Sequence, residues 1–224
     1  MNTLRHTPNI ASKAEKPRNT RRALLLGLGA ATLLPMLQGC FPVITTDVGA
    51  GAALVSDRRT SGTYVEDEGI EWKVSSRIRE RFGNTAHVNV TSYNRNVLLT
   101  GEAPNDTVRG ELDAIVAGVE HVRGVINEVV VGPNSALTAR GNDTLITSNV
   151  KARFVDAGRF SAHNVKVVTE ANVVFLMGIV TRAEADAAAE VARTSQGVRK
   201  VVRVFEYISD EEARRLDNPT GARR

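Results

Sequence analysis

One cysteine and four histidines are the side chains through which this 224-residue sequence could attack a substrate or hold a transition metal. The histidines lie far apart in the chain, at His6, His87, His121 and His163. None has a second histidine or the cysteine nearby at the spacing that zinc sites use. We therefore expect no catalytic residues, no metal site and no cofactor. We interpret His87 and His163 as polar residues at strand edges.

The surroundings of Cys40, the one thiol, favour acylation over redox chemistry. A lone cysteine cannot form an intramolecular disulfide. Leu37 stands three residues before it and Gly39 directly before it, which resembles the lipobox cut by lipoprotein signal peptidase. We predict cleavage before Cys40 and a thioether-linked diacylglycerol on its sulfur. Acyl chains contribute about 0.8 kcal/mol per buried CH₂, so such an anchor would be durable.

Residues 1–39 are typical of an export signal. A basic stretch ends at Arg22, and the apolar run 23–36 is too short to span a bilayer core of about 30 Å. The Arg21-Arg22 pair leaves open whether export is by the general secretory or the twin-arginine route. Phe41, rather than aspartate, follows the cysteine, which resembles Gram-negative lipoproteins sorted to the outer membrane. We expect a lipid-anchored protein on the periplasmic face of that membrane.

The charge of the mature chain argues against nucleic acid as a partner. The whole chain has 29 basic and 25 acidic side chains. Residues 1–39 hold six of the basic ones and one acidic one, so 23 and 24 remain after cleavage. A protein that binds duplex DNA needs a lasting basic surface to displace counterions. We therefore expect no nucleic-acid binding.

The sequence after residue 66 contains one pattern of elements twice. An apolar stripe at i, i+4 and i+8 predicts a buried helix face in each copy. We pair the two stripes as Val74, Ile78 and Phe82 with Ile146, Val150 and Phe154. Each copy continues with two β-branched runs around a short polar turn, then a second helix and a last strand. These segments are 87–91, 96–101, 108–119 and 122–129, and then 164–168, 173–178, 181–192 and 198–204.

The order helix, strand, strand, helix, strand predicts an α+β fold with two helices on a three-stranded mixed sheet in each of two tandem domains. We place these domains at 67–132 and 143–209. Residues 40–66 are expected to be a lipid-anchored linker, and 210–224 a disordered tail. Gly101 and Gly178, at the ends of the hairpins, are interpreted as structural residues that permit a tight turn or a close helix approach.

Several segments of both copies resemble a known domain family. The hairpins ending in glycine, the helices after them and the segments Asn142-Asp143-Thr144, 175–178 and 197–201 resemble the BON domain in both copies. With the lipobox, the chain resembles the outer-membrane lipoproteins that carry two BON domains. This resemblance implies a non-enzymatic role in outer-membrane integrity, with anionic phospholipid bound through the second domain.

The first helix of the second copy offers a surface for that role. Small and apolar residues lie opposite its buried stripe, and two cations flank them. The predicted lipid-binding residues are Leu145, Ser148, Lys151, Ala152, Arg153 and Val155. The charge distribution also favours the second copy as the lipid-binding one. Residues 67–132 carry a net charge of −3, and residues 143–209 carry a net charge of +2.

Two alternatives remain open at this level. The outward stripe could pack on the first domain, or it could be an ordinary helix surface, since scattered exposed apolar residues are common. The whole protein could also act as an adaptor that binds and regulates envelope enzymes or the outer-membrane assembly machinery.

Overall fold

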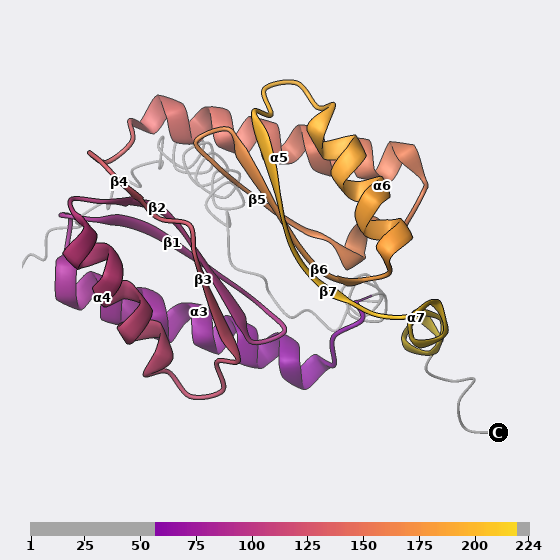
Figure 1. Cartoon of the computed structure of the whole chain (residues 1–224), viewed down its shortest axis with the longest axis horizontal. Helices are drawn as coiled ribbons and strands as arrows, with labels where there is room; N and C mark the ends of the chain where they lie inside the picture. The colour runs from indigo at the N-terminus through magenta and orange to yellow at the C-terminus, as the bar shows by residue number, and fades with distance from the viewer. Residues whose placement is uncertain (1–56, 219–224) are drawn as a thin grey trace, which may run out of the picture. The chain divides into compact units, whose positions relative to one another are not determined.

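The computed structural model describes residues 57–218. The predicted export signal, Cys40 and the first part of the predicted linker lie outside this range. Within it the chain forms the two expected α+β domains (Figure 1). The first contains α3 (Ser61–Phe82), β1 (His87–Tyr93), β2 (Asn96–Ala103), α4 (Asp106–Ala117), β3 (Gly124–Asn127) and β4 (Val130–Val131). The second contains α5 (Leu137–Ala157), η2 (Ala162–Asn164), β5 (Lys166–Glu170), β6 (Val173–Val180), α6 (Arg182–Arg193) and β7 (Lys200–Tyr207), and α7 (Asp210–Asp217) follows it.

The two sheets are mixed and built alike. In the first, β1 pairs antiparallel with β2, and β3 and the short β4 both pair parallel with β2. In the second, β5 pairs antiparallel with β6, and β7 pairs parallel with β6. A parallel return needs a crossover, which α4 and α6 supply. The predicted fold class is thereby confirmed.

Helices cover the outer face of each sheet, and the two sheets turn their other faces toward each other (Figure 1). Each domain has its own aliphatic core between helices and sheet. A third apolar cluster joins the domains. Its buried members are Tyr93, Leu98, Phe175, Met177 and Ile179. Since this cluster draws on both sheets, the two domains share one interface core.

The helix registers differ from our pairing by one turn. The buried residues of α3 are Asp67, Ile70, Val74 and Ile78, and those of α5 are Asp143, Ile146, Val150 and Phe154. The structural equivalents are therefore Ile70 with Ile146 and Val74 with Val150. Phe82, which we matched to Phe154, is only half-buried. A slip of four residues preserves an i, i+4 stripe, so apolar periodicity alone could not detect the error.

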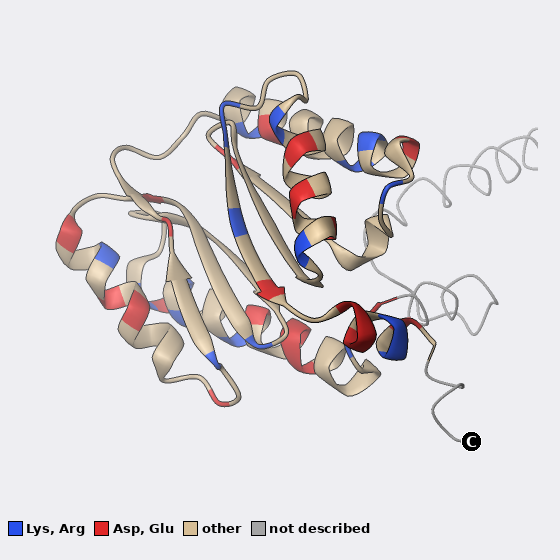
Figure 2. Ribbon diagram, turned by 45° about the vertical axis from the view of Figure 1, so that its right-hand side comes forward, with Lys and Arg blue, Asp and Glu red and all other residues tan. Residues whose placement is uncertain are grey.

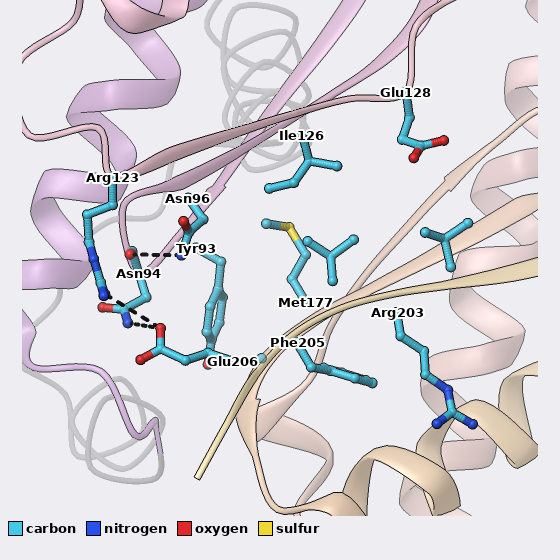
Figure 3. Close-up of a pocket in the computed structure, with 13 residues that line it drawn as sticks. Tyr93, Asn94, Asn96, Arg123, Ile126, Glu128, Met177, Arg203, Phe205 and Glu206 are labelled. Atoms are coloured by element: carbon cyan, nitrogen blue, oxygen red, sulfur yellow. Dashed lines mark hydrogen bonds and ion pairs between the residues drawn. The ribbon is translucent and has the colours of Figure 1, made fainter.

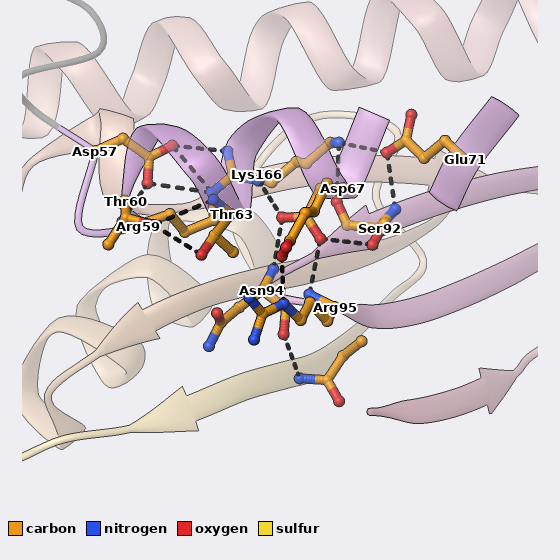
Figure 4. Close-up of polar contacts among 12 residues, drawn as sticks. Asp57, Arg59, Thr60, Thr63, Asp67, Glu71, Ser92, Asn94, Arg95 and Lys166 are labelled. Atoms are coloured by element: carbon orange, nitrogen blue, oxygen red, sulfur yellow. Dashed lines mark hydrogen bonds and ion pairs between the residues drawn. The ribbon is translucent and has the colours of Figure 1, made fainter. Parts of the chain in front are cut away.

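A buried aspartate at the start of each stripe explains this register. Asp143 accepts hydrogen bonds from the backbone N–H groups of Ala171 and Asn172, at 2.9 and 2.8 Å. Asp67 accepts the same pair from Asn94 and Arg95, at 2.8 and 2.7 Å (Figure 4). Each aspartate thus joins the first helix of its domain to the turn of the hairpin.

Both turns need this support because their backbones are strained. Asn94 and Arg95 have φ of 50° and 66°, and Ala171 and Asn172 have φ of 49° and 64°. Residues with a side chain rarely adopt this left-handed conformation. The carboxylate satisfies two N–H groups that the turn directs inward, and thereby stabilises a type of turn that glycine usually occupies.

Two of the predicted boundaries are wrong. Residues 57–66 are not all linker, because α3 begins at Ser61 with Thr60 as its N-cap. The tail is not disordered from residue 210, because Asp210–Asp217 form α7, capped by Ser209, with Ala213 buried. We read the acidic start of α7 as a polar tail, but acidic residues in a first turn are favoured by the helix dipole.

Asp143→Ala should lower the free energy of unfolding by about 3 kcal/mol or more, because it leaves two buried N–H groups without a charged acceptor. Urea unfolding followed by circular dichroism measures this loss. Asp156→Ala is the matched control, since Asp156 is exposed on the same helix. Equal stability of the two variants would contradict the role given to Asp143.

Gly101→Ala should destabilise the first domain by at least about 2 kcal/mol. Gly101 has a φ of 115°, and an added Cβ would stand 2.0 Å from the backbone oxygen of His87. In Gly110→Ala the new methyl group would meet nothing within 4 Å. Because Gly110 lies inside α4, this control should gain up to about 1 kcal/mol from helix propensity. Thermal unfolding of both variants compares the two effects.

Candidate membrane interface

Helix α5 carries a line of exposed apolar side chains along its outer face. Leu137, Leu145 and Val155 have 80%, 70% and 69% of their surface exposed. At 3.6 residues per turn they lie on one side of the helix, together with the exposed Gly141, Ser148 and Ala152. We call these six residues the α5 stripe. The stripe contains no charged side chain, which is unusual for a helix face turned to water.

This surface has two causes. The opposite side of α5 is buried, and a hydrogen bond within the helix reduces the polarity of the exposed side. Ile146, Val150 and Phe154 on the other side of α5 are buried in the core of the second domain. Ser148 donates its hydroxyl to the backbone oxygen of Thr144 at 3.0 Å, so its polar group is partly satisfied within the helix. Ser148 thus adds little free polarity to the α5 stripe.

Arg153 is not part of this face. Its guanidinium donates to the backbone oxygen of Val191, to Ser195 Oγ and to Thr194 Oγ1, at 3.0, 2.6 and 3.1 Å. These partners lie at the carboxyl end of α6, where a cation is favoured by the helix dipole. Arg153 therefore holds α5 to α6, and its lipid-binding role stays a prediction. The structure places the other five predicted residues on the exposed surface.

A hollow with basic walls adjoins the α5 stripe. It has a volume of about 470 Å³, and its walls include Lys151, His163 and Lys166 beside the apolar Val155. Lys166 is bound to Glu71 at 2.8 Å, while Lys151 makes no ion pair within residues 57–218. Figure 2 shows that lysines and arginines also occur on α5 and along β7. A cation at the edge of an apolar stripe suits an anionic interface.

The residues that lead into α3 are held firmly to the folded domains. Arg58 is buried and donates to Glu184 Oε2 at 2.7 Å, to Asp217 Oδ1 at 2.8 Å and to the backbone oxygen of Ile179. Arg59 binds Asp57 and Asp67 (Figure 4). Its guanidinium lies 4.1 Å from the centre of the Tyr93 ring. We call Arg58 and Arg59 with these partners the arginine clamp.

A family model described as the BON domain matches residues 66–133 and 142–209. The chain belongs to the BON-domain family. Outer membrane lipoprotein DolP of Haemophilus influenzae is 38% identical over 188 residues, which cover 83% of this chain and 95% of that protein. The 21 kDa hemolysin of Actinobacillus pleuropneumoniae is 37% identical over 154 residues, covering 68% and 79%. Osmotically-inducible protein Y of Escherichia coli is 27% identical over 161 residues, covering 70% and 80%.

These matches confirm a DolP-like protein with two BON domains. They also support a lipoprotein that is associated with the outer membrane. No helix among residues 57–218 has the length and apolar character needed to cross a bilayer.

The interface between the two BON domains opens into a groove of about 600 Å³ (Figure 3). Ile126 of β3 faces Met177 of β6 and Phe205 of β7 across it. Glu206 closes one end by accepting a hydrogen bond from Asn94 at 2.6 Å and pairing with Arg123 at 3.5 Å. The groove thus combines an apolar lining with a polar end.

A second polar cluster lies at the opposite side of this interface. His87, Glu102 and Glu170 bring ligand-type atoms within 4.8 Å of one another. From the sequence we interpret His87 as a polar residue at a strand edge. The hairpin register does pair His87 with Glu102, so this neighbour was accessible from the sequence. Glu170 comes from the other BON domain, and no local pattern connects it with His87.

Arg58 and Glu184 give the arginine clamp a defined pH dependence. Burial alone would raise the pKa of Glu184, but hydrogen bonds from Arg58 and the Thr181 backbone outweigh it and lower the pKa below its ordinary value of 4.5. A lowered pKa in the folded state means that the stabilisation is complete above the unfolded value of 4.5 and is lost as the pH falls through the folded value.

Glu184→Gln should therefore cost about 3 kcal/mol at neutral pH and less at an acid pH below 4.5, measured by urea unfolding at both pH values. Asp186→Asn is the control. Asp186 also binds an arginine, Arg203, but its side chain is 70% exposed, so this loss should stay below about 1 kcal/mol. A cost for Glu184→Gln that is the same at both pH values would contradict the assignment.

Proposed function

We propose that this protein is anchored by a diacylglycerol on Cys40 to the periplasmic face of the outer membrane. There it binds anionic phospholipid through α5 of its second BON domain and helps to maintain the membrane barrier. The observation that carries the proposal is the α5 stripe, with Leu137, Leu145 and Val155 exposed on one uncharged side of the helix. The role is one of binding rather than catalysis.

The distribution of charge supports the second domain as the one that meets the lipid. Residues 143–209 carry a net +2, and residues 67–132 a net −3. Each basic group near an anionic surface contributes about 1 kcal/mol. Lys151, beside the α5 stripe, is well placed for a lipid phosphate, and the hollow that it shares with His163 has room for a headgroup.

The proposed diacylglycerol anchor lowers the affinity that the α5 stripe itself must have for lipid. Burying an apolar side chain of this size fully contributes about 1.5–3 kcal/mol, so three exposed ones give only modest affinity on their own. The anchor at Cys40 would keep α5 close to the bilayer at a high effective concentration. Because the arginine clamp holds residues 58 and 59 to the domains, only residues 41–57 separate the anchor from the folded body.

Leu145→Glu combined with Val155→Glu should abolish flotation of the unlipidated chain, from residue 41 on, with vesicles that contain phosphatidylglycerol. Two carboxylates on the α5 stripe would have to enter the interface beside anionic lipid. The control pair, Trp72→Glu with Val130→Glu, adds the same charge at sites 71% and 55% exposed in the first BON domain. It should float as the parent does. Unchanged flotation of the α5 variant with an intact fold would disprove the proposal.

Lys151→Glu should weaken the same flotation and reduce its salt dependence, since exposed charges are screened at about 10 Å in 0.1 M salt. Arg153→Gln serves as the contrast. Its arginine bonds within the fold, so that change should lower stability more than vesicle binding. The opposite ranking of the two variants in flotation would count against Lys151 as the lipid-facing cation.

The interdomain groove favours a second function, protein binding as an adaptor. An extended segment of a partner could lie along the open edge of β7, above the apolar lining of the groove. Crosslinking from position 204 in envelope membranes should then capture a defined partner, and Val204→Arg should remove it while leaving vesicle flotation intact. Absence of any specific product would exclude this function.

A further inference from the structure

We propose that His87, Glu102 and Glu170 form a site for a divalent transition-metal ion, with Zn²⁺ as the best fit, that links the two BON domains. His87 Nδ1 lies 2.9 Å from Glu102 Oε2, and the ligand atoms of all three residues lie within 4.8 Å of one another. His87 and Glu102 belong to β1 and β2 of the first domain, and Glu170 ends β5 of the second.

The backbone places the first two ligands. His87 and Glu102 are partners in the β1–β2 ladder, so their side chains project on the same face of the sheet. Gly101, next to Glu102, has no Cβ, and this lets β2 approach the backbone oxygen of His87 closely. The hairpin therefore holds an imidazole and a carboxylate side by side before any metal binds.

Hydrogen bonds orient the third ligand toward the other two. Glu170 Oε2 accepts from Asn89 Nδ2 at 2.8 Å and from Thr100 Oγ1 at 3.3 Å, and both donors belong to the first domain. Glu102 Oε2 accepts from the backbone N–H of Ser135 at 3.2 Å. Such outer partners fix the direction of metal ligands in many sites.

The two buried carboxylates of the cluster favour a bound cation. Glu102 and Glu170 are 6% and 8% exposed, and within residues 57–218 neither forms an ion pair with a lysine or arginine. Burying two carboxylates near each other is costly unless positive charge compensates them. A divalent ion would balance both negative charges.

The ligand set selects zinc among the common ions. Zn²⁺ binds nitrogen and carboxylate oxygen at about 2.0–2.2 Å, and sites with three protein ligands leave a fourth position for water. Ca²⁺ and Mg²⁺ prefer a coordination shell made of oxygen atoms alone, whereas this cluster includes an imidazole nitrogen. Small side-chain rotations would bring the three ligand atoms to tetrahedral spacing, about 3.3 Å for bonds of that length.

A route from solvent reaches the cluster. A polar cavity of about 430 Å³ between β1 and α5 is lined by His87 and Glu170 together with Thr144, Ser148 and Lys151. A hydrated ion can therefore enter without unfolding. Once bound, the ion would connect strands of both BON domains close to the α5 stripe and restrict their relative movement.

Isothermal titration with Zn²⁺ tests the site on the full chain in detergent, made without a polyhistidine tag. We expect one ion per chain, and an affinity reduced by more than about tenfold in His87→Gln, Glu102→Gln and Glu170→Gln. His163→Gln is the matched control, because His163 is exposed in η2 outside the cluster, and it should bind as the parent does. Zn²⁺ should also raise the midpoint of thermal unfolding of the parent and the control.

Three results would overturn the proposal. One is an absence of Zn²⁺ binding by the parent chain. Another is binding that the His87 and Glu170 variants retain while circular dichroism shows them folded. The third is a preference for Ca²⁺ over Zn²⁺. Loss of fold in one variant leaves the other two to decide the question. Because vesicle flotation is measured separately, failure of this site would not affect the lipid proposal.

Discussion

A buried carboxylate that binds the turn of a hairpin is the interaction on which each BON domain depends. Asp67 and Asp143 connect a helix to a strand pair across the domain, and each satisfies two backbone N–H groups of residues with positive φ. This contact sets the rotation of the helix. Once the rotation is set, one side of the helix enters the core and the other faces outward, which in α5 produces the α5 stripe.

The contact between the aspartate and the hairpin turn has different consequences in the two domains. In the first domain, Asp67 also binds Arg59 and Ser92, so the turn is joined to the segment that precedes α3. In the second, Asp143 binds the turn, and the outer side of α5 is left open. Duplication has thus given one domain that holds the lead-in segment and another that presents a free helix surface.

Much of the architecture could be predicted from the sequence because it follows from local patterns. β-branched runs and apolar stripes identified the strands and helices in the right order, and the exposure of Leu145 and Val155 followed from the burial of Ile146 and Val150. The helix register could not be predicted in this way, since a slip of one turn keeps the stripe. The buried Asp67 fixes the helix register. Its partners Asn94 and Arg95 can be identified only once the hairpin is folded onto the helix.

The remaining features depend on contacts between distant residues. Arg153 looked like an exposed cation, but its partners lie at and just after the carboxyl end of α6, about forty positions further along the chain. Leu137 was missed because we began the second domain at 143, whereas α5 starts six residues earlier. Glu170 reaches His87 only because the two sheets face each other. Local periodicity contains no information on how two domains meet.

The arginine clamp has a consequence for the order in which the chain matures. Arg58 finds its partners 126 and 159 residues further on, at Glu184 and Asp217. A chain that is synthesised amino terminus first cannot complete this contact until Glu184 and Asp217 have been made. The arginine clamp therefore closes only after the second BON domain and α7 have been made, and its closure is a late step in folding.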